Sequence, residues 1–227
     1  MNPSQRNILK FAALALVLSI VIFFAYKMLS KKEEDPAQVT EMSSPSPQAS
    51  PSATTDAPAT PPTYDLTPEA SGLSKATVVM KTSKGVIKFK FYTKDAPTTV
   101  NRFAELAHSK FYNGLAFHRV VPGFVVQAGD PKSRNKNDPT VGTGGSGQKL
   151  KAEFNGRKHE RGTVAMARAA DPDSADSQFY VTLGKFPHLD NQYTVIGQVV
   201  DFGEKQGDKD VLDRIRQWDE ITEMHIE

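Results

Sequence analysis

Two polar side chains stand out in the mostly apolar stretch FHRVVPGFVVQAGD, which runs from Phe117 to Asp130. They are Arg119 and Gln127, one on each side of a Pro-Gly pair. The valines and phenylalanines around them occupy both odd and even positions, which predicts short strands that are buried on both faces. A guanidinium in such surroundings either reaches solvent along its aliphatic stem or points into a cleft where it can donate hydrogen bonds. The stretch by itself leaves both interpretations open.

The rest of the sequence gives little support to thiol, metal or nucleotide chemistry. The chain has no cysteine, and its five histidines show no HExxH spacing. The glycines at 142, 144 and 147 match GxGxxG but open no helix, and Asp171 to Ser177 lacks the glycine and closing glutamate of a calcium loop. We therefore predict no metal and no cofactor. A net charge of +2 also argues against nucleic acid as a partner.

Short strands punctuated by glycine and proline must position these side chains. Ile87, Phe89 and Phe91 alternate with lysines, which predicts a hairpin with one solvated face. Pro97 precedes an apolar spacing of i, i+3, i+4 and i+7, which predicts a helix ending near His108. The expected strands are 77–81, 86–91, 116–120, 124–128, 162–167, 178–183, 193–199 and 221–227, with a second helix at 209–218. This order lacks the rhythm of βαβ units and predicts a closed antiparallel barrel.

The N-terminal segment differs in kind, because an uncharged apolar run extends from Phe11 to Tyr26. Its length falls short of a hydrocarbon core of about 30 Å, but residues 8–29 reach across if Lys10 and Lys27 snorkel. We predict that residues 1–32 anchor the chain in the cell membrane through a single transmembrane helix at about 8–29. A cleaved signal peptide is the alternative, although no small-x-small site follows the run closely. A single N-terminal helix favours an extracytoplasmic position for the remaining chain.

Ser, Pro, Thr and Ala dominate residues 33–74. Too few apolar side chains are present to offset the entropy of ordering, and frequent proline favours extended conformations. We predict a disordered linker there, followed by a folded domain at 75–227. Recognition of the linker prolines as PxxP ligands is the alternative.

Five ordered blocks of the folded part carry a family resemblance: FYNGLAFHRVVPGFVVQAGD, GTGG, RGTVAMAR, SQFYVT and LDNQYTVIGQV. With these blocks, the chain from about Ala76 to Glu227 resembles a cyclophilin, a peptidyl-prolyl cis-trans isomerase, and is similar to the bacterial-type branch. The resemblance implies an eight-stranded closed antiparallel barrel capped by two α-helices. It also implies an enzyme that accelerates rotation about X–Pro bonds in proline-containing polypeptides.

The resemblance also implies the site residues. Arg119 matches the catalytic arginine, Gln127 matches the glutamine that orients it and contacts substrate, and Phe124 belongs to the proline pocket. Taken singly, the apolar residues would be assigned to the barrel core. The further implied substrate-binding residues are His118 beside the arginine, Met166, Phe179 and Leu189 in the pocket, and Ala167, Arg168 and Gln178 along the edge where the peptide backbone lies.

Three positions depart from the family pattern. Tyr180 stands where many members have a second pocket phenylalanine, and Tyr193 replaces a histidine common in eukaryotic members. Both keep a ring, so both are included among the substrate-binding residues. His188 takes the place of the tryptophan associated with tight cyclosporin binding, which predicts weak binding of that drug.

Anchor and resemblance together predict an isomerase at the membrane that assists the folding of exported proteins, where prolyl rotation is slow. One alternative is a membrane-tethered peptide-binding or chaperone module whose isomerase activity is incidental. Another is a scaffold displayed at the membrane. Arg119 favours the enzyme, because a pure binding module has no evident need of that arginine.

Overall fold

The computed structural model describes residues 72–227, so the predicted anchor at 1–32 and nearly all of the predicted linker lie outside the described residues. Within 72–227, no helix combines the length and the apolar character needed to cross a membrane. The strands are β1 (Thr77–Thr82), β2 (Gly85–Phe91), β3 (Leu115–Ala116), β4 (Arg119–Val121), β5 (Val125–Ala128), β6 (Thr163–Met166), β7 (Phe179–Thr182), β8 (Val195–Asp201) and β9 (Glu220–Ile226). The α-helices are α2 (Pro97–His108) and α3 (Val211–Arg214), and the short 3-10 helices are η1 (Pro131–Arg134), η2 (Pro172–Ser174) and η3 (Pro187–Leu189).

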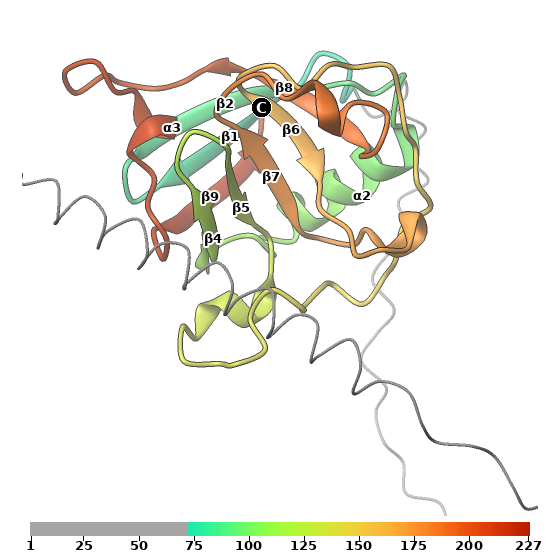
Figure 1. The fold of residues 1–227 in the computed structure, drawn as a ribbon, viewed down its shortest axis with the longest axis horizontal. Helices are drawn as coiled ribbons and strands as arrows, with labels where there is room; N and C mark the ends of the chain where they lie inside the picture. Colours follow the sequence, from blue (N-terminus) through green and yellow to red (C-terminus); the bar gives the residue numbers. More distant parts are fainter. Residues whose placement is uncertain (1–71) are drawn as a thin grey trace, which may run out of the picture. The chain divides into compact units, whose positions relative to one another are not determined.

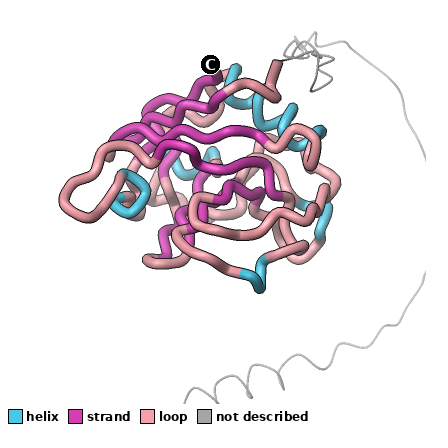
Figure 2. The backbone as a smooth tube through the Cα atoms, turned by 90° about the horizontal axis from the view of Figure 1, so that it is seen from above, coloured by secondary structure: helices cyan, strands magenta, loops and turns pink. Residues whose placement is uncertain are grey.

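The nine strands form one sheet in the order β3-β9-β1-β2-β8-β6-β7-β5-β4, and every pairing is antiparallel (Figure 1). The two edge strands, β3 and β4, are consecutive in the chain and are separated only by Phe117 and His118. The sheet is therefore curved so that its edges approach each other, with the helices at its periphery (Figure 2). Nine strands replace the predicted eight because the strand expected at 116–120 is divided into β3 and β4. Within the described residues no hydrogen-bonded ladder pairs β3 with β4. The two edges of this barrel-like sheet are therefore connected by the covalent chain, not by strand pairing.

The main core fills the concave side of the sheet. Ile87, Phe89 and Phe91 of β2 are buried whereas Lys90 is exposed, which confirms the predicted alternation. The rings of Phe89 and Phe91 contact Phe103 of α2 edge-on, with centroid distances of 5.9 and 5.8 Å. Helix α2 therefore shares one core with the sheet.

Helix α2 begins at Pro97, as predicted. The fixed φ of proline suits the first turn, where its missing N–H costs no hydrogen bond. The carboxylate of Glu153 accepts hydrogen bonds from the backbone N–H groups of Thr98 and Thr99 at 3.0 and 2.8 Å. Its negative charge thus lies at the positive end of the helix dipole and satisfies two N–H groups of the first turn.

The second predicted helix, 209–218, is reduced to the single turn α3. Ile215 is already extended, with ψ 135°, and Trp218 adopts a positive φ of 72°, so Trp218 does not lie on a helix as predicted. Three of the four apolar residues that predicted the helix are nevertheless buried, Val211, Leu212 and Ile215, whereas Trp218 is 37% exposed. One turn followed by extended chain is enough to bury these three side chains, and Trp218 stays outside the core.

Ordered packing begins before the predicted domain start at residue 75. Leu73 is 3% exposed and packs in the main core. The carbonyl of Gly72 accepts a hydrogen bond from the N–H of Lys75 at 3.0 Å. The last residues assigned to the linker therefore belong to the folded part.

Candidate active site

The apolar stretch that carries Arg119 and Gln127 forms an antiparallel hairpin of β4 and β5. At its turn the N–H of Phe124 donates to the carbonyl of Val121 at 2.9 Å, and Gly123 has a φ of +73° that glycine adopts without steric cost. Arg119 lies opposite Gln127 in this register, and Arg119 Nη1 donates to Gln127 Oε1 at 3.3 Å. The hairpin thus joins the two polar side chains on one face.

A row of paired residues continues across the sheet on that face. Gln127 pairs with Tyr180, Tyr180 with Ala165, and Ala165 with Val195. Directly paired residues of antiparallel strands point to the same side of a sheet. The outer face therefore carries, in order, a cation on β4, an amide on β5 and apolar side chains on β7, β6 and β8.

The next row along the same strands faces the main core. Ala128 pairs with Phe179, and Phe179 with Met166. Phe179 and Met166 are 0% and 1% exposed, and the Phe179 ring contacts Phe103 and Tyr112 at centroid distances of 5.4 and 5.6 Å. The structure therefore places Met166 and Phe179 in the main core and not in the predicted pocket, because strand alternation turns them away from it.

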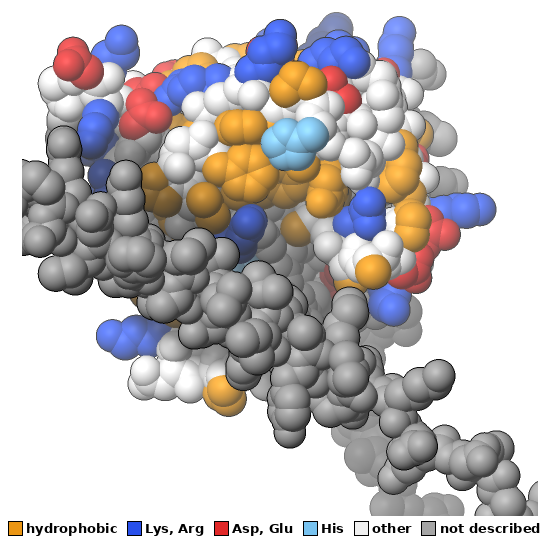
Figure 3. All heavy atoms as spheres, in the orientation of Figure 1, with side chains coloured by type: hydrophobic (Ala, Val, Ile, Leu, Met, Phe, Trp, Pro, Cys, Tyr) orange, Lys and Arg blue, Asp and Glu red, His pale blue; other side chains and the backbone are white. Residues whose placement is uncertain are grey.

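A second apolar cluster lies on the outer face. Its buried members are Val125, Ala165, Tyr180 and Val195, and the partly buried residues packed against them are Tyr92, Phe124, Ala167, Leu189 and Tyr193. We call these nine residues the outer apolar cluster. Hydrophobic side chains gather beside a histidine on the face over β6 and β7 (Figure 3). Rings that are only half-buried can bury further apolar surface against a ligand such as a proline ring.

Phe124 is the member of this cluster that lies beside the arginine. The guanidinium carbon of Arg119 lies 6.0 Å from the Phe124 ring centroid. Phe186 contacts the same ring edge-on at 4.8 Å, and His188 stacks on it at 6.1 Å. Neither Phe186 nor Val125 was predicted as a site residue, because Val125 stands in the predicted strand 124–128 and Phe186 lies between two predicted strands without a pattern of its own. Phe124 is thus held from two sides while part of its ring stays accessible.

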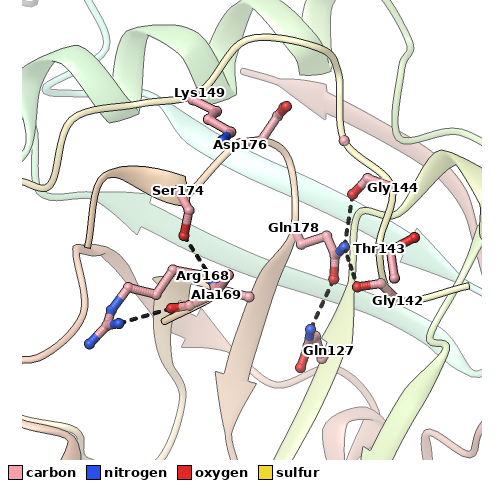
Figure 4. Close-up of a pocket in the computed structure, with 12 residues that line it drawn as sticks. Gln127, Gly142, Thr143, Gly144, Lys149, Arg168, Ala169, Ser174, Asp176 and Gln178 are labelled. Carbon is pink, nitrogen blue, oxygen red and sulfur yellow. Dashed lines mark hydrogen bonds between the residues drawn. The ribbon is translucent and has the colours of Figure 1, made fainter. Parts of the chain in front are cut away.

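Two glutamines connect Arg119 to a glycine-containing loop, and Figure 4 shows the part of this link that runs from Gln127 through Gln178 to the loop. Gln178 Nε2 donates to the carbonyls of Gly142 and Gly144 at 3.0 and 2.8 Å, and Gln127 Nε2 donates to Gln178 Oε1 at 3.0 Å. Carbonyl oxygens only accept, so the NH2 group of the Gln178 side chain must face the loop, and its side-chain oxygen must face Gln127. Gln127 then has its oxygen left for the arginine. The loop carbonyls therefore fix the orientation of both amides.

The loop itself is held by carboxylates. Asp130 accepts from the N–H groups of Gly142 and Gly144, and Asp176 accepts from those of Ser146 and Gly147. These backbone N–H groups of the loop are thus hydrogen-bonded within the protein, and this holds the loop in place. Within residues 72–227, no group of three or more His, Asp or Glu side chains could hold a metal ion.

A cavity of about 380 Å³ lies beside the two glutamines (Figure 4). Four predicted site residues line it: Gln127, Ala167, Arg168 and Gln178. Arg119 and Phe124 are not among its lining residues. Ala167 also packs against the outer apolar cluster, so the two areas adjoin. We call the outer apolar cluster, this cavity and Arg119 together the groove.

Arg168 is committed to local contacts at the edge of the groove. Its Nε donates to the carbonyl of Gln192 at 3.0 Å and its Nη1 to that of Ala169 at 2.9 Å. Its guanidinium carbon lies 5.0 Å from the Tyr193 ring centroid, a cation-π distance. Arg168 therefore covers one side of Tyr193 and stiffens that wall of the groove.

His118, which precedes Arg119, is 7% exposed. Burial lowers the pKa of its imidazole, so it is neutral near pH 7 and adds no positive charge beside the arginine. Among the described residues, no carboxylate forms an ion pair with Arg119. The guanidinium therefore keeps its full charge at the rim of the apolar cluster.

Comparison with known proteins identifies the family. Residues 77–225 match the model of the family described as cyclophilin type peptidyl-prolyl cis-trans isomerase/CLD. A peptidyl-prolyl cis-trans isomerase of Helicobacter pylori is 41% identical over 161 residues, which cover 70% of this chain and 91% of that protein. Peptidyl-prolyl cis-trans isomerase B of Bacillus subtilis is 40% identical over 135 residues, covering 57% of this chain and 89% of the relative.

A solved structure shows the same fold. The crystal structure of a Cryptosporidium parvum cyclophilin type peptidyl-prolyl cis-trans isomerase, in the presence of the dipeptide Ala-Pro, superposes with a TM-score of 0.55. Sequence identity is 24%, and the superposition covers 66% of this chain and 98% of the other. Since the family model spans most of the chain and the Helicobacter pylori enzyme is matched over nine-tenths of its length, the chain belongs to the cyclophilin-type peptidyl-prolyl cis-trans isomerases.

Proposed function

We propose that the chain isomerises X–Pro bonds of proline-containing polypeptides in the groove, with Arg119 stabilising the twisted amide. The observation that carries this proposal is the position of the Arg119 guanidinium, 6.0 Å from the Phe124 ring centroid and 3.3 Å from Gln127 Oε1. A fixed hydrogen-bond donor thus borders a partly accessible apolar wall. A proline ring packed on that wall brings its amide within reach of the guanidinium.

The physical task is to lower a torsional barrier. Rotation about the amide costs about 18–20 kcal/mol because resonance is lost. In the twisted state the prolyl nitrogen is pyramidal and regains a lone pair that accepts a hydrogen bond better than the planar amide does. A donor placed there binds the transition state better than either ground state, and about 7 kcal/mol of such preference accelerates rotation roughly 10⁵-fold.

Gln127 prepares the arginine for that role. Its oxygen accepts from Nη1 of the Arg119 guanidinium, and the guanidinium has further N–H groups with which to donate to a substrate. A neutral acceptor orients the cation without cancelling its charge, which a carboxylate would do. The planar fork of arginine also loses less freedom per hydrogen bond than an ammonium would.

Several features support a place for this activity at the cell membrane. The apolar run from Phe11 to Tyr26 and the Pro-rich stretch after it suit an anchor and a tether that hold the domain outside the cytoplasm, where it assists the folding of exported proteins. The relatives from Helicobacter pylori and Bacillus subtilis favour the bacterial-type branch of the family. The Ala-Pro dipeptide used with the Cryptosporidium parvum relative supports proline-containing substrates.

The deciding experiment measures isomerisation of an Ala-Pro-containing peptide by the purified full-length chain. Arg119→Ala should lower kcat/KM by at least tenfold, and Arg119→Lys should recover only part of the loss because the ammonium lacks the planar fork. Arg134→Ala is the matched control, since Arg134 is an exposed arginine that donates to the carbonyls of Phe111 and Asn113 outside the groove. Equal rates for wild type and Arg119→Ala would refute the role of the arginine, while retained peptide binding would then favour the chaperone alternative.

A further inference from the structure

A buried histidine behind the outer apolar cluster links three segments of the groove wall. The His159 side chain is 0% exposed and lies in the loop before β6. Its Nε2 is 2.9 Å from the hydroxyl oxygen of Tyr180 on β7, and its Nδ1 is 3.2 Å from Oδ1 of Asp190, which directly follows η3. The sequence around it, GRKHERG, gave no reason to single it out.

The positions of the protons in the hydrogen bonds from Asp190 through His159 to Tyr180 can be assigned from chemistry. The backbone N–H of His159 donates to Asp190 at 2.9 Å and lowers the pKa of that carboxyl to about 2, with Lys158 contributing, so Asp190 is ionised near neutral pH. Burial lowers the pKa of His159, which is therefore neutral there. A carboxylate only accepts, so Nδ1 carries the proton, and Nε2 is left to accept the hydroxyl proton of Tyr180.

The hydroxyl is the polar contact of a ring that is otherwise held by packing. Tyr180 is 5% exposed, its ring stacks on His159 at 6.0 Å with an interplanar angle of 16°, and it meets Tyr193 edge-on at 5.5 Å. Such contacts let a ring slide in its plane at little cost, whereas a hydrogen bond at its tip fixes its depth. The bond to His159 therefore sets how far Tyr180 reaches into the wall.

The same histidine fixes the turn that carries Leu189. The carbonyl of His159 accepts from the N–H of Phe186 at 2.8 Å, so both its backbone and its side chain bind the 186–190 segment. Phe186 in turn supports the Phe124 ring. Displacement of His159 would shift Tyr180 and Leu189 relative to each other.

We propose that His159 is a positioning residue of the isomerase, which sets the relative placement of Tyr180 and Leu189 in the wall that receives the proline ring. This inference rests on the proposed function of the groove. His159 does not reach the substrate and acts through the Tyr180 hydroxyl and Asp190. A phenylalanine at 180 would fill the same space but would leave Nε2 of His159 buried without a partner.

The test compares Tyr180→Phe, His159→Leu and the double variant in the full-length chain, with kcat and KM for an Ala-Pro peptide measured separately from the thermal midpoint. Each single variant should lower kcat/KM by about 2- to 10-fold, the range that one hydrogen bond supports. The kcat/KM of the double variant should be no lower than that of the less active single variant, since both substitutions remove the same hydrogen bond. Tyr112→Phe is the matched control, because Tyr112 donates its hydroxyl to the carbonyl of Ser177 at 3.3 Å in the main core. It should lower the thermal midpoint and leave kcat/KM unchanged.

A ¹⁵N NMR spectrum of the imidazole provides a readout that does not depend on activity. At pH 7 His159 should show a protonated Nδ1 and an accepting Nε2, and Tyr180→Phe should shift the Nε2 resonance. A protonated Nε2, an unchanged kcat/KM in both single variants, or an equal loss of kcat/KM in the control Tyr112→Phe would overturn the inference. An active wild type would in each case still support the proposed function. A wild type as slow as Arg119→Ala would overturn the proposed function, and this inference with it.

Discussion

Replacing Gln127 by alanine should slow isomerisation without unfolding the protein. The substitution removes the acceptor that holds Arg119 Nη1 and breaks the link from Arg119 through Gln178 to the loop carbonyls. Gln127 is only partly buried on the outer face, so little core packing is lost. The arginine stays in place but explores more rotamers, and fewer of them point toward the substrate amide.

The size of the effect follows from the geometry. A hydrogen bond to a charged group contributes about 1.5–3 kcal/mol. The lower end applies here, because Arg119 is exposed and 3.3 Å is long for an N–H···O bond. Since about 1.4 kcal/mol corresponds to a factor of ten in rate, Gln127→Ala should lower kcat/KM roughly tenfold.

The isosteric variant Gln127→Glu separates orientation from charge. A carboxylate would hold Arg119 more tightly but would neutralise part of its charge, so the loss should exceed that of alanine. Gln198→Ala is the control, since Gln198 also bonds across strands, to Thr163 and to the carbonyl of Arg161, away from the groove. Peptide isomerisation and thermal unfolding are measured for all three. A Gln127→Glu enzyme as fast as wild type would refute the argument that Arg119 works as an unneutralised cation.

Three further predictions concern the two faces of the sheet and residues in and directly after η3. Phe124→Ala should lower kcat/KM by about tenfold with a small change in thermal midpoint, because its ring is only partly buried, whereas Phe179→Ala removes a fully buried ring and should cost about 3–5 kcal/mol of folding free energy. The reverse order in a thermal melt would contradict the assignment of faces. Since the pKa of Asp190 is lowered to about 2, its contribution to stability is complete above its unfolded pKa near 4 and is lost as the pH falls toward 2. Thermal midpoints of wild type and Asp190→Asn should therefore converge over that window, and a constant difference would contradict it. His188→Trp should strengthen inhibition by cyclosporin in the peptide assay, and unchanged inhibition would show that this position does not limit binding of the drug.

Strand positions could be predicted from the sequence, because turns at glycine and proline bound each apolar run. Residue orientation could not be predicted in the strands that matter most. All four residues of β6, TVAM, and all four of β7, FYVT, are buried, so polarity does not reveal which side faces the core. The pairing of Gln127 with Tyr180 and of Tyr180 with Ala165 shows which residues of these strands face outward. Met166 and Phe179, one position away, therefore face the main core. A family motif locates such residues in the chain but does not say which way they point.

Two other features depend on contacts between distant segments. The predicted second helix shortens to α3 because Val211, Leu212 and Ile215 reach the core from a single turn and an extended residue, while Trp218 stays exposed. His159 carries no signal in a charged loop, and its role becomes visible only when β7 and η3 bring Tyr180 and Asp190 to its two ring nitrogens.

The position of Arg119 at the sheet edge explains why it needs support from other residues. It lies on β4, a strand of three residues, and within residues 72–227 the sheet pairs this strand with β5 alone. An edge strand gives an approaching peptide access to the guanidinium, but it supplies no neighbour to fix that side chain. The fixing comes instead from the amides of Gln127 and Gln178, which transmit the position of the glycine-containing loop across β5 and β7. Accessibility and order are thus supplied by different parts of the molecule, and this separation allows a charged side chain to be both exposed and held in one orientation.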